Sequence, residues 1–370
     1  MICKRISVEG FRNIESADVE FSDGVNVLVG NNAQGKTNLL EAIYFITLGK
    51  SFRSASESEM IGFDSDHAAI SLDFCDSIRE QNISVRVFRD HRKRFEQNGV
   101  KIFKMSDVVG ELRAVLFCPE HLSIVKEGPS VRRNFLDVAI SQMRPVYLKS
   151  LQKYNKFLKQ RNKLLKDAED DRKTFDDTIE FWSAGLASEG AKLAKMRKQY
   201  LEICDGYVKK YFADMTGGSE LPELKYAGSA KQDLADYDDE KKTEEKFFSL
   251  LTSNLEREIA VGSTLWGAHK DDIDIYINGR EAKIYCSQGQ QRSLALAMKL
   301  AEGEICKNDS GEYPVFLFDD VFSELDATRR SYLINEIKGK QVIMTGCDLS
   351  LMSEPGARII RVEGGKYFRE

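Results

Sequence analysis

A glycine-rich octapeptide, GNNAQGKT at residues 30 to 37, constrains what this chain can fold into more than any other stretch. It matches the phosphate-binding pattern G-x-x-x-x-G-K-[ST] in the setting that this pattern needs. The apolar run from Val25 to Val29 predicts a buried strand before it, and LLEAIYFITL predicts a helix after it that stops at Gly49. Strand, loop and helix in this order predict a nucleotide-binding α/β fold.

The residue types of the octapeptide suit a triphosphate bound together with Mg²⁺. Gly30 and Gly35 allow the backbone to curve so that its N–H groups point inward, where the helix start adds positive potential. Lys36 is placed to neutralise the outer phosphates, and the Thr37 hydroxyl to bind the metal ion. The predicted ATP-binding residues of this segment are Gly30, Asn31, Asn32, Ala33, Gln34, Gly35, Lys36, Thr37 and Asn38.

A second, acidic motif lies far along the chain. In PVFLFDD, residues 314 to 320, a short apolar strand delivers two carboxylates at its C-terminal end, where open α/β sheets bind their ligands. We expect Asp319 to hold Mg²⁺ together with Thr37, and Asp320 to orient or deprotonate the attacking water as the catalytic residue. Acidic residues often follow strands by chance, so this motif gains its weight from the phosphate-binding loop.

Three further segments resemble motifs of the ABC-type ATPases. SQGQQ (287–291) resembles the signature motif, which in that superfamily contacts the γ-phosphate held by a partner subunit. SELD (323–326) resembles the loop that crosses the same dimer interface, and VIMTG (342–346) ends a strand where those ATPases place a switch residue. The resemblance implies that Ser287, Gly289 and Gln290 act on ATP bound by a second copy of the chain.

The ABC-type pattern is followed with departures. Gly346 stands where a histidine is common, Asp320 replaces a glutamate, and Glu120 is the nearest candidate for the expected Q-loop glutamine. The shorter reach of an aspartate suggests slow turnover. We therefore expect a weak ATPase whose hydrolysis serves as a switch rather than as a fast motor.

Between the two motifs the chain carries a long helical segment. From Ser130 to Tyr211 apolar residues recur at three- and four-residue steps, which predicts an antiparallel helical pair with residues 167–177 near its tip. On either side the chain has β character, with Asn98-Gly99 and Asn278-Gly279 predicting hairpin turns. We expect an ABC-type head, with a mixed sheet around the P-loop helix, and an inserted helical lobe that carries the signature-side surface and a possible DNA contact. The expected division is residues 1–118 plus 261–370 for the ATPase lobe and 119–260 for the helical lobe.

The composition excludes several classes of protein. Seven scattered cysteines without C-x-x-C, and four histidines without close pairing, argue against a disulfide scaffold and a metal site made only of side chains. The chain shows no apolar run long enough for a membrane and no signal sequence, so we expect a cytoplasmic protein. A net charge of −5 argues against a protein that coats nucleic acid, but not against a local basic patch.

One stretch is a candidate for such a patch. The DNA-binding candidates within it are Lys149, Lys153, Lys156 and Lys159, in a run of basic residues that continues to Lys166. A solvated helix face is the other interpretation of the same run. Because the chain shows no groove-reading motif, any DNA binding is expected to depend on structure or length rather than on sequence.

Segments spread from residue 8 to residue 326 resemble the RecF family, bacterial recombination mediators related to SMC heads but without their long coiled coil. They are VEGFRNIE (8–15), VLVGNNAQGKTNLLEAIYFITLGKSFR (27–53), FCPEHLSIVKEGPSVRRNFLD (117–137), GAHKDD (267–272), SQGQQRSLALAMKLAE (287–302) and FLFDDVFSELD (316–326). The resemblance implies an ATP-dependent homodimer, formed head to tail, that binds gapped or junction DNA and releases it on hydrolysis. It also implies work with RecR and RecO in loading RecA during DNA repair, replication-fork recovery and the SOS response.

Some residues keep two interpretations. Arg12 and Asn13, in GFRN, are ATP-binding candidates or turn residues facing solvent. Arg132 and Arg133 bind phosphates or only begin a helix, and Lys270 contacts nucleotide or pairs with a neighbouring aspartate. The alternative function is the nucleotide-binding subunit of an ABC transporter, which the long gap between Thr37 and Ser287 and the missing switch histidine disfavour.

Overall fold

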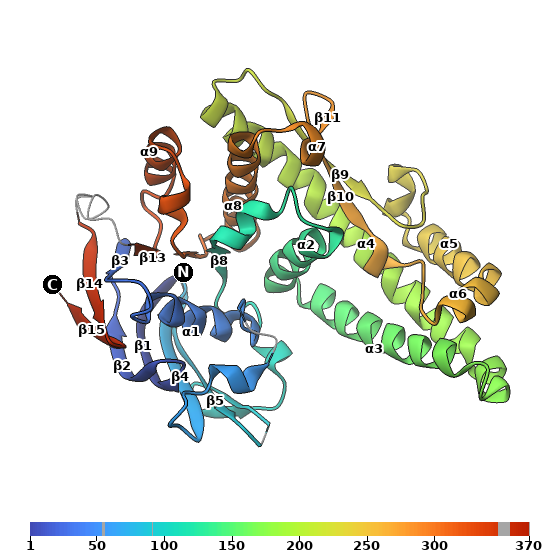
Figure 1. Ribbon diagram of the computed structural model, residues 1–370, viewed down its shortest axis with the longest axis horizontal. Coiled ribbons are helices and arrows are strands. Elements are labelled where there is room, and N and C mark those ends of the chain that lie inside the picture. Colours follow the sequence, from blue (N-terminus) through green and yellow to red (C-terminus); the bar gives the residue numbers. More distant parts are fainter. Residues whose placement is uncertain (54–55, 91, 347–355, 370) are drawn as a thin grey trace. The chain divides into compact units, whose positions relative to one another are not determined.

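The computed structural model describes residues 1–53, 56–90, 92–346 and 356–369 (Figure 1). The chain forms two compact units. Unit 1 contains Met1–Ser123, Tyr211–Gly218 and Arg292–Glu370, and unit 2 contains Ile124–Lys210 and Ser219–Gln291. This division differs from the predicted boundaries chiefly at residues 261–291, which belong to unit 2. The signature segment therefore lies in the helical unit and not in the unit that contains the P-loop.

The first sheet of unit 1 is antiparallel, with the strand order β2-β1-β4-β5-β6-β7. In β4 the alternate residues Ala68, Ile70 and Leu72 are buried, as expected for a sheet with one face in the core. The predicted turn at Asn98-Gly99 is confirmed: both residues have positive φ, 51° and 76°, and join β6 to β7. The strands are β1 (Ile2–Phe11), β2 (Ile14–Glu20), β4 (His67–Cys75), β5 (Glu80–Phe88), β6 (Arg94–Gln97) and β7 (Val100–Ile102).

The second sheet of unit 1 is mixed, with the strand order β15-β14-β3-β13-β12-β8. Neighbouring strands from β14 to β8 are parallel, and only β15 is antiparallel to its neighbour. The four inner and edge strands β3, β13, β12 and β8 read as nearly continuous apolar runs because both of their faces are covered, whereas β14 alternates buried and exposed residues. Their bounds are β3 (Val25–Val29), β8 (Ala114–Phe117), β12 (Val315–Phe318), β13 (Val342–Gly346), β14 (Arg358–Glu363) and β15 (Lys366–Arg369).

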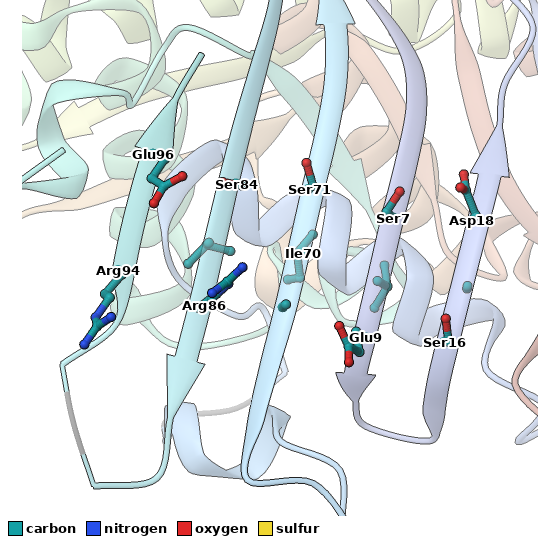
Figure 2. A pocket seen from close by; sticks show the side chains of 14 residues that line it. Ser7, Glu9, Ser16, Asp18, Ile70, Ser71, Ser84, Arg86, Arg94 and Glu96 are labelled. Carbon is teal, nitrogen blue, oxygen red and sulfur yellow. The ribbon is translucent and has the colours of Figure 1, made fainter. Parts of the chain in front are cut away.

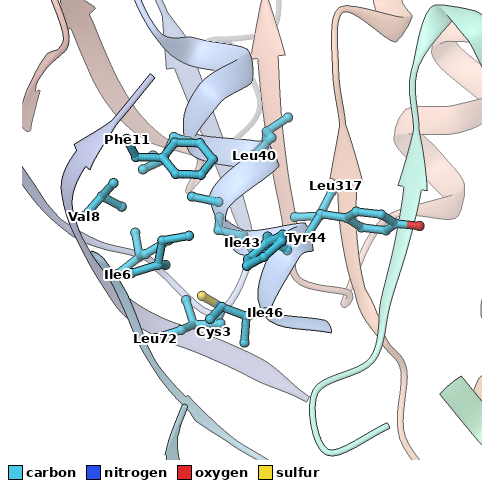
Figure 3. Packing of buried hydrophobic residues seen from close by; sticks show 14 of the residues in the cluster. Cys3, Ile6, Val8, Phe11, Leu40, Ile43, Tyr44, Ile46, Leu72 and Leu317 are labelled. Carbon is cyan, nitrogen blue, oxygen red and sulfur yellow. The ribbon is translucent and has the colours of Figure 1, made fainter. Parts of the chain in front are cut away.

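The P-loop helix α1 (Lys36–Leu48) packs against strands of both sheets. Leu39, Ile43 and Ile46 are completely buried, and they join side chains from both sheets in one core cluster (Figure 3). Apolar residues on every side of a helix are what such a buried position requires. The helix ends, as predicted, at Gly49, whose φ of 65° closes the last turn. Thus the predicted mixed sheet around a P-loop helix is confirmed.

Two further helices of unit 1 come directly before strands of the second sheet in the chain, α8 before β12 and α9 before β13. Helix α8 (Gln288–Ser310) begins in the signature segment, and its residues from Arg292 onward belong to unit 1. Helix α9 (Ala327–Glu336) comes after the acidic motif, and the side chain of Asp326 caps its first turn by accepting from the Arg329 N–H.

Unit 2 is mainly helical. Pro129 and Pro145 stand at the first positions of α2 and α3, where a missing N–H costs nothing. The predicted helical pair is confirmed as α3 and α4, joined at residues 168–171. The predicted Asn278-Gly279 turn is confirmed between β10 and β11, in a sheet ordered β11-β10-β9. The elements are α2 (Pro129–Met143), α3 (Pro145–Asp167), α4 (Arg172–Thr216), β9 (Pro222–Ala227), α5 (Glu240–Ser253), α6 (Leu255–Val261), β10 (Asp272–Ile277), β11 (Arg280–Glu281) and α7 (Ala282–Tyr285).

Buried ion pairs fix the RecF-like segment GAHKDD within unit 2. Asp272 accepts two hydrogen bonds, of 2.7 and 2.8 Å, from Arg132, which is 5% exposed. Asp271 lies 3.6 Å from Arg197 and accepts from the Tyr226 hydroxyl. The structure therefore gives Arg132 a role in packing, and among the described residues Asp271 and Asp272 pair with these arginines rather than with Lys270.

Two further features of the described residues concern the cysteines and the hydropathy of the helices. The described cysteines are free thiols, as predicted: Cys3, Cys118, Cys204 and Cys306 are buried, and Cys75 and Cys286 are partly exposed. The seventh, Cys347, lies outside the described residues. No helix within the described ranges is both long and apolar enough to cross a bilayer.

Candidate nucleotide-binding site

The phosphate-binding loop leaves β3 at Gly30 and enters α1 at Lys36. A side chain at Gly30 would place its Cβ 2.2 Å from the carbonyl oxygen of Val362, so only glycine fits beside β14. Gly35 has a φ of 113° and lies under Asn13 and Tyr367, whose hydroxyl donates to the Gly35 carbonyl over 2.9 Å. The loop conformation therefore depends on strands that come both before and long after it in the chain.

Lys36 turns back across the loop. Its Nζ donates to the carbonyl oxygens of Gly30, at 2.5 Å, and Asn31, at 2.8 Å. The side chain is only 8% exposed, so the ammonium group is held in place. An ammonium beside the N-terminus of α1 gives the loop the positive potential that phosphate oxygens need.

Three side chains connect the P-loop to the acidic motif. The Thr37 hydroxyl donates to Asp319 Oδ1 over 2.7 Å, and the Thr345 hydroxyl donates to the same oxygen over 2.8 Å. Asp319 is 8% exposed; burial raises the pKa of its carboxyl above the ordinary value, and the two hydroxyls oppose that rise. A hydroxyl and a carboxylate in contact fit the oxygen ligands that Mg²⁺ prefers, so the residues present suit this ion.

Asp320 stands apart from its buried neighbour. It is exposed and has a φ of 50°, in the left-handed region that non-glycine residues rarely adopt. Its N–H donates to the Thr345 hydroxyl over 2.9 Å, and its carbonyl accepts from Ser323 over 2.7 Å. These bonds at both ends of the residue hold it in this unusual conformation, with its carboxylate at the cavity described next.

A cavity of about 370 Å³ opens beside these groups. Its lining residues are Asn13, Asn32, Ala33, Gln34, Gly35, Lys36, Thr37, Asn38, Arg53, Asp320 and Thr345. Most of the predicted ATP-binding residues are in this set, while Gly30 and Asn31 provide the carbonyls that hold Lys36. Arg53 and Thr345 are not among the predicted site residues, although both lie in segments that resemble known motifs, 27–53 and 342–346.

Arg12 does not line this cavity. It donates to both carboxylate oxygens of Glu41, over 3.1 and 2.6 Å, and to the Glu59 carbonyl over 2.8 Å. Glu41 lies on α1, is completely buried and also accepts from Arg53 at 3.4 Å. Asn13, the other candidate in GFRN, does line the cavity and donates to the Ala33 carbonyl over 3.2 Å. Arg12 thus positions the loop through Glu41, and the signal for Glu41 in the sequence is that it is the one acidic residue of α1.

The signature segment begins α8 with a capping box. The Gln290 N–H donates to the Ser287 hydroxyl oxygen over 3.2 Å, and the Ser287 N–H donates to Gln290 Oε1 over 2.7 Å. The Gln290 amide also donates to Glu220. Ser287 is exposed, and Gly289 and Gln290 are partly exposed. Much of the polarity that marked this segment therefore stabilises the start of its own helix.

The predicted basic residues form one face of α3. Lys149, Lys153, Lys156 and Lys159 are all exposed, and so are Lys163 and Lys166 on the same side of the helix. Lys153 lies 3.5 Å from the carboxylate of Glu189 on α4. The residues from 145 to 166 include no aspartate or glutamate, so the face is cationic along its length.

A second hollow, of about 440 Å³, lies on the outer face of the first sheet (Figure 2). Its centre is a row of short side chains, Ser7, Ser71 and Ser84, placed side by side by the strand register. Asp18 and Glu96 end this row. It has no glycine-rich loop and no helix N-terminus, so the P-loop cavity is the better candidate for a nucleotide.

The sequence matches known proteins over most of its length. The family described as "RecF/RecN/SMC N terminal domain" matches residues 2–364. The "DNA replication and repair protein RecF" of Ruminiclostridium cellulolyticum is 38% identical over 346 residues, 93% of this chain and 92% of that protein. The protein of the same name from Clostridium perfringens is 37% identical over 369 residues, 99% of each chain.

Solved structures agree with these matches. The "recombination mediator protein RecF-ATP in RecFOR pathway" superposes with a TM-score of 0.91 at 35% identity, covering 100% of this chain and 97% of that one. An SMC head bound to the C-winged helix domain of ScpA gives a TM-score of 0.58 at 16% identity, covering 100% of this chain and 97% of that one, which indicates a shared fold alone. The ABC-type head is thereby confirmed as the fold, and the chain belongs to the RecF family.

Proposed function

We propose that the protein is an ATP-driven switch that acts on DNA, in the cytoplasm, during recombinational repair and replication-fork recovery. Its relatives are named DNA replication and repair proteins, and a solved relative is described with ATP in the RecFOR pathway. The observation that carries the proposal is the contact of Thr37 and Thr345 with the buried Asp319, beside the P-loop cavity. A P-loop hydroxyl next to a buried carboxylate is what a magnesium–nucleotide site requires.

Different residues of the site bind the phosphates, the metal ion and the attacking water. The N–H groups of the loop and the start of α1 attract the phosphates, and Lys36 exchanges its bonds to Gly30 and Asn31 for phosphate oxygens. Thr37 and Asp319 are the residues that would hold Mg²⁺, which neutralises phosphate charge when bound. Asp320, exposed at the cavity, orients or deprotonates the attacking water. Its short side chain makes hydrolysis slow, which suits a switch.

ATP binding is proposed to join two copies head to tail. The hydroxyl of Ser287 accepts the capping bond from Gln290 and so keeps its own hydrogen available for a phosphate. The N-terminus of α8 is partly open, with Ser287 exposed, and adds positive potential. Ser287, Gly289 and Gln290 would thus contact the ATP of a second copy, and hydrolysis would separate the pair.

DNA is proposed to lie along the cationic face of α3. Exposed lysines neutralise backbone phosphates without reading bases, so binding depends on DNA structure and falls steeply with salt. As in the pathway named for the solved relative, we infer cooperation with RecR and RecO to load RecA on gapped or junction DNA. A transporter subunit, the alternative, receives no support from the relatives.

The test compares Lys36→Met with the unchanged protein. We expect ATP affinity to fall at least 100-fold and ATP-dependent dimerisation to disappear, because the phosphates lose their cation. Equilibrium binding of a fluorescent ATP analogue and size-exclusion chromatography measure the two effects. Lys50→Met, just beyond α1, is the matched control and should change neither. Dimerisation of the Lys36 variant with ATP would refute the assignment of the loop.

A further inference from the structure

Unit 2 carries a cluster of three aromatic rings at the surface of the α3–α4 pair. Phe157 of α3 lies edge-on to Phe181 and Trp182 of α4, with ring centroids 6.3 and 5.9 Å apart, and the latter two are 5.2 Å apart. Phe181 is 65% exposed. An exposed aromatic cluster on a soluble protein marks an interaction site more often than an isolated exposed ring does.

The rings are held in place by the packing of the two helices. Phe157 lies against Gly185, where an added Cβ would come within 2.3 Å of the ring. One turn further along α3, Arg161 donates to the Ser183 hydroxyl over 2.9 Å and is completely buried. A rigid aromatic surface loses little conformational entropy when a flat partner stacks on it.

Cations lie beside the cluster. Lys153 and Lys156 precede Phe157 by one turn and by one residue, and both are exposed. The carboxylate of Glu189 lies 3.5 Å from Lys153 and 3.2 Å from Lys192, so its charge is compensated. Two exposed acids, Asp177 and Glu180, precede Phe181 in α4 by one turn and by one residue. A polyanion would therefore lie toward the Lys149 end of α3 and away from the tip of the pair.

We propose that this cluster binds unpaired DNA bases, which stack on Phe181 and Trp182 while Lys153 and Lys156 hold the adjacent phosphates. This inference rests on the proposed DNA binding by α3 and assigns the single-stranded part of that DNA to the aromatic cluster. Aromatic side chains beside a cationic surface are the usual means of holding single strands without reading sequence. In a duplex the base faces are covered by their neighbours, so only the lysines can contribute.

The test measures fluorescence anisotropy with labelled oligothymidine and with a duplex of equal length, in the presence of ATP. Phe181→Ala should weaken binding of the single strand by about 5- to 100-fold and change duplex binding less than about twofold. Phe103→Ala, which removes another exposed phenylalanine in unit 1, is the matched control and should leave both affinities unchanged. Lys156→Gln should weaken both DNA forms, because it removes a phosphate contact from each.

The outcomes separate the two proposals. If Phe181→Ala weakens both DNA forms equally, or neither, the base-stacking inference is wrong even though α3 binds DNA. If the unchanged protein binds no DNA, or Lys156→Gln binds as before, DNA binding by α3 is itself wrong, and the inference with it. Capture of an acidic peptide in place of oligothymidine would assign the cluster to a protein partner. Quenching of Trp182 by the single strand, read in a Trp266→Phe background, gives a second readout of stacking.

Discussion

The P-loop and the signature segment both place polar groups at the start of a helix, yet they are built differently. Thr37 depends on Asp319, and Gly35 on Tyr367, residues that lie 282 and 332 positions away in sequence. Ser287 instead obtains its bonds from Gln290, three residues on. The first helix start is positioned by the tertiary fold, and the second largely by its own sequence. A substitution at the P-loop should therefore perturb residues far away in the sequence, whereas a substitution in the signature segment should affect only its own helix start.

The strongest test of this contrast removes the charge shared by the P-loop and the acidic motif. Asp319→Asn keeps the shape of the side chain but loses the carboxylate between Thr37 and Thr345. We expect ATP hydrolysis to fall by about 100- to 1,000-fold, the usual loss for a group that stabilises charge in a reacting phosphate. A phosphate-release assay at saturating ATP measures the rate. Hydrolysis within threefold of the unchanged protein would contradict the assignment.

The next test breaks the support behind the P-loop by changing a residue that does not itself line the cavity. Glu41→Gln removes a buried charge that pairs with Arg12 and Arg53. We expect the free energy of unfolding to fall by about 2 kcal/mol, because Arg12 keeps partial access to water and is not left fully buried without its partner. This loss lowers the melting temperature of unit 1 by roughly 5 °C. Differential scanning calorimetry measures the shift. Glu57→Gln, which breaks the exposed pair with Lys93, is the control and should shift the transition by less than about 1 °C.

The two units share one feature, a partly buried histidine that is neutral in the fold. Burial lowers the pKa of His121 in unit 1 to about 3 and of His269 in unit 2 to about 4. Unfolded histidine has a pKa of about 6.5, so the unfolded chain takes up protons first and stability falls as the pH drops below that value. Each histidine should therefore lower the free energy of unfolding by about 2 kcal/mol at pH 5 relative to pH 7.

The acid sensitivity can be assigned to a unit by replacement. His269→Gln keeps a polar side chain without a titrating ring, so the unit 2 transition should lose most of its dependence on pH between 5 and 7. Urea unfolding followed at several pH values measures the slope. An unchanged slope for unit 2 would show that other groups cause it.

The smallest expected effects concern Ser287, the residue that caps helix α8 in the signature segment. Ser287→Asn preserves a good helix cap but removes the hydroxyl, whereas Ser287→Ala loses both and should cost about 1 kcal/mol of stability. We expect both variants to bind ATP as monomers and to dimerise more weakly, and only the alanine variant to melt earlier. Size-exclusion chromatography with ATP and thermal melting separate the two roles. Normal dimerisation of the asparagine variant would restrict Ser287 to capping.

The sequence was informative wherever a local pattern determines the structure. The octapeptide, the hairpin turns at Asn98 and Asn278, and the α3–α4 pair were all predicted, since short-range chemistry specifies them. Contacts made by distant residues were not: Arg53 and Thr345 reach the cavity only because the fold brings them there. The pairing of Arg12 with Glu41 was not foreseen, because a turn residue near a P-loop gives no sign of a buried acid. Likewise, Phe157 meets Phe181 and Trp182 only after α3 and α4 pack together.

The burial of α1 between the two sheets has a mechanical consequence. A helix with a solvent face can absorb a small displacement by moving side chains into water, but Leu39, Ile43 and Ile46 have no such freedom. If phosphate binding displaces the first turn of α1, we expect the whole helix to move as a rigid body together with the strands that pack against it. We therefore expect nucleotide binding at the start of α1 to be felt in the first sheet of unit 1, strands of which pack against this helix.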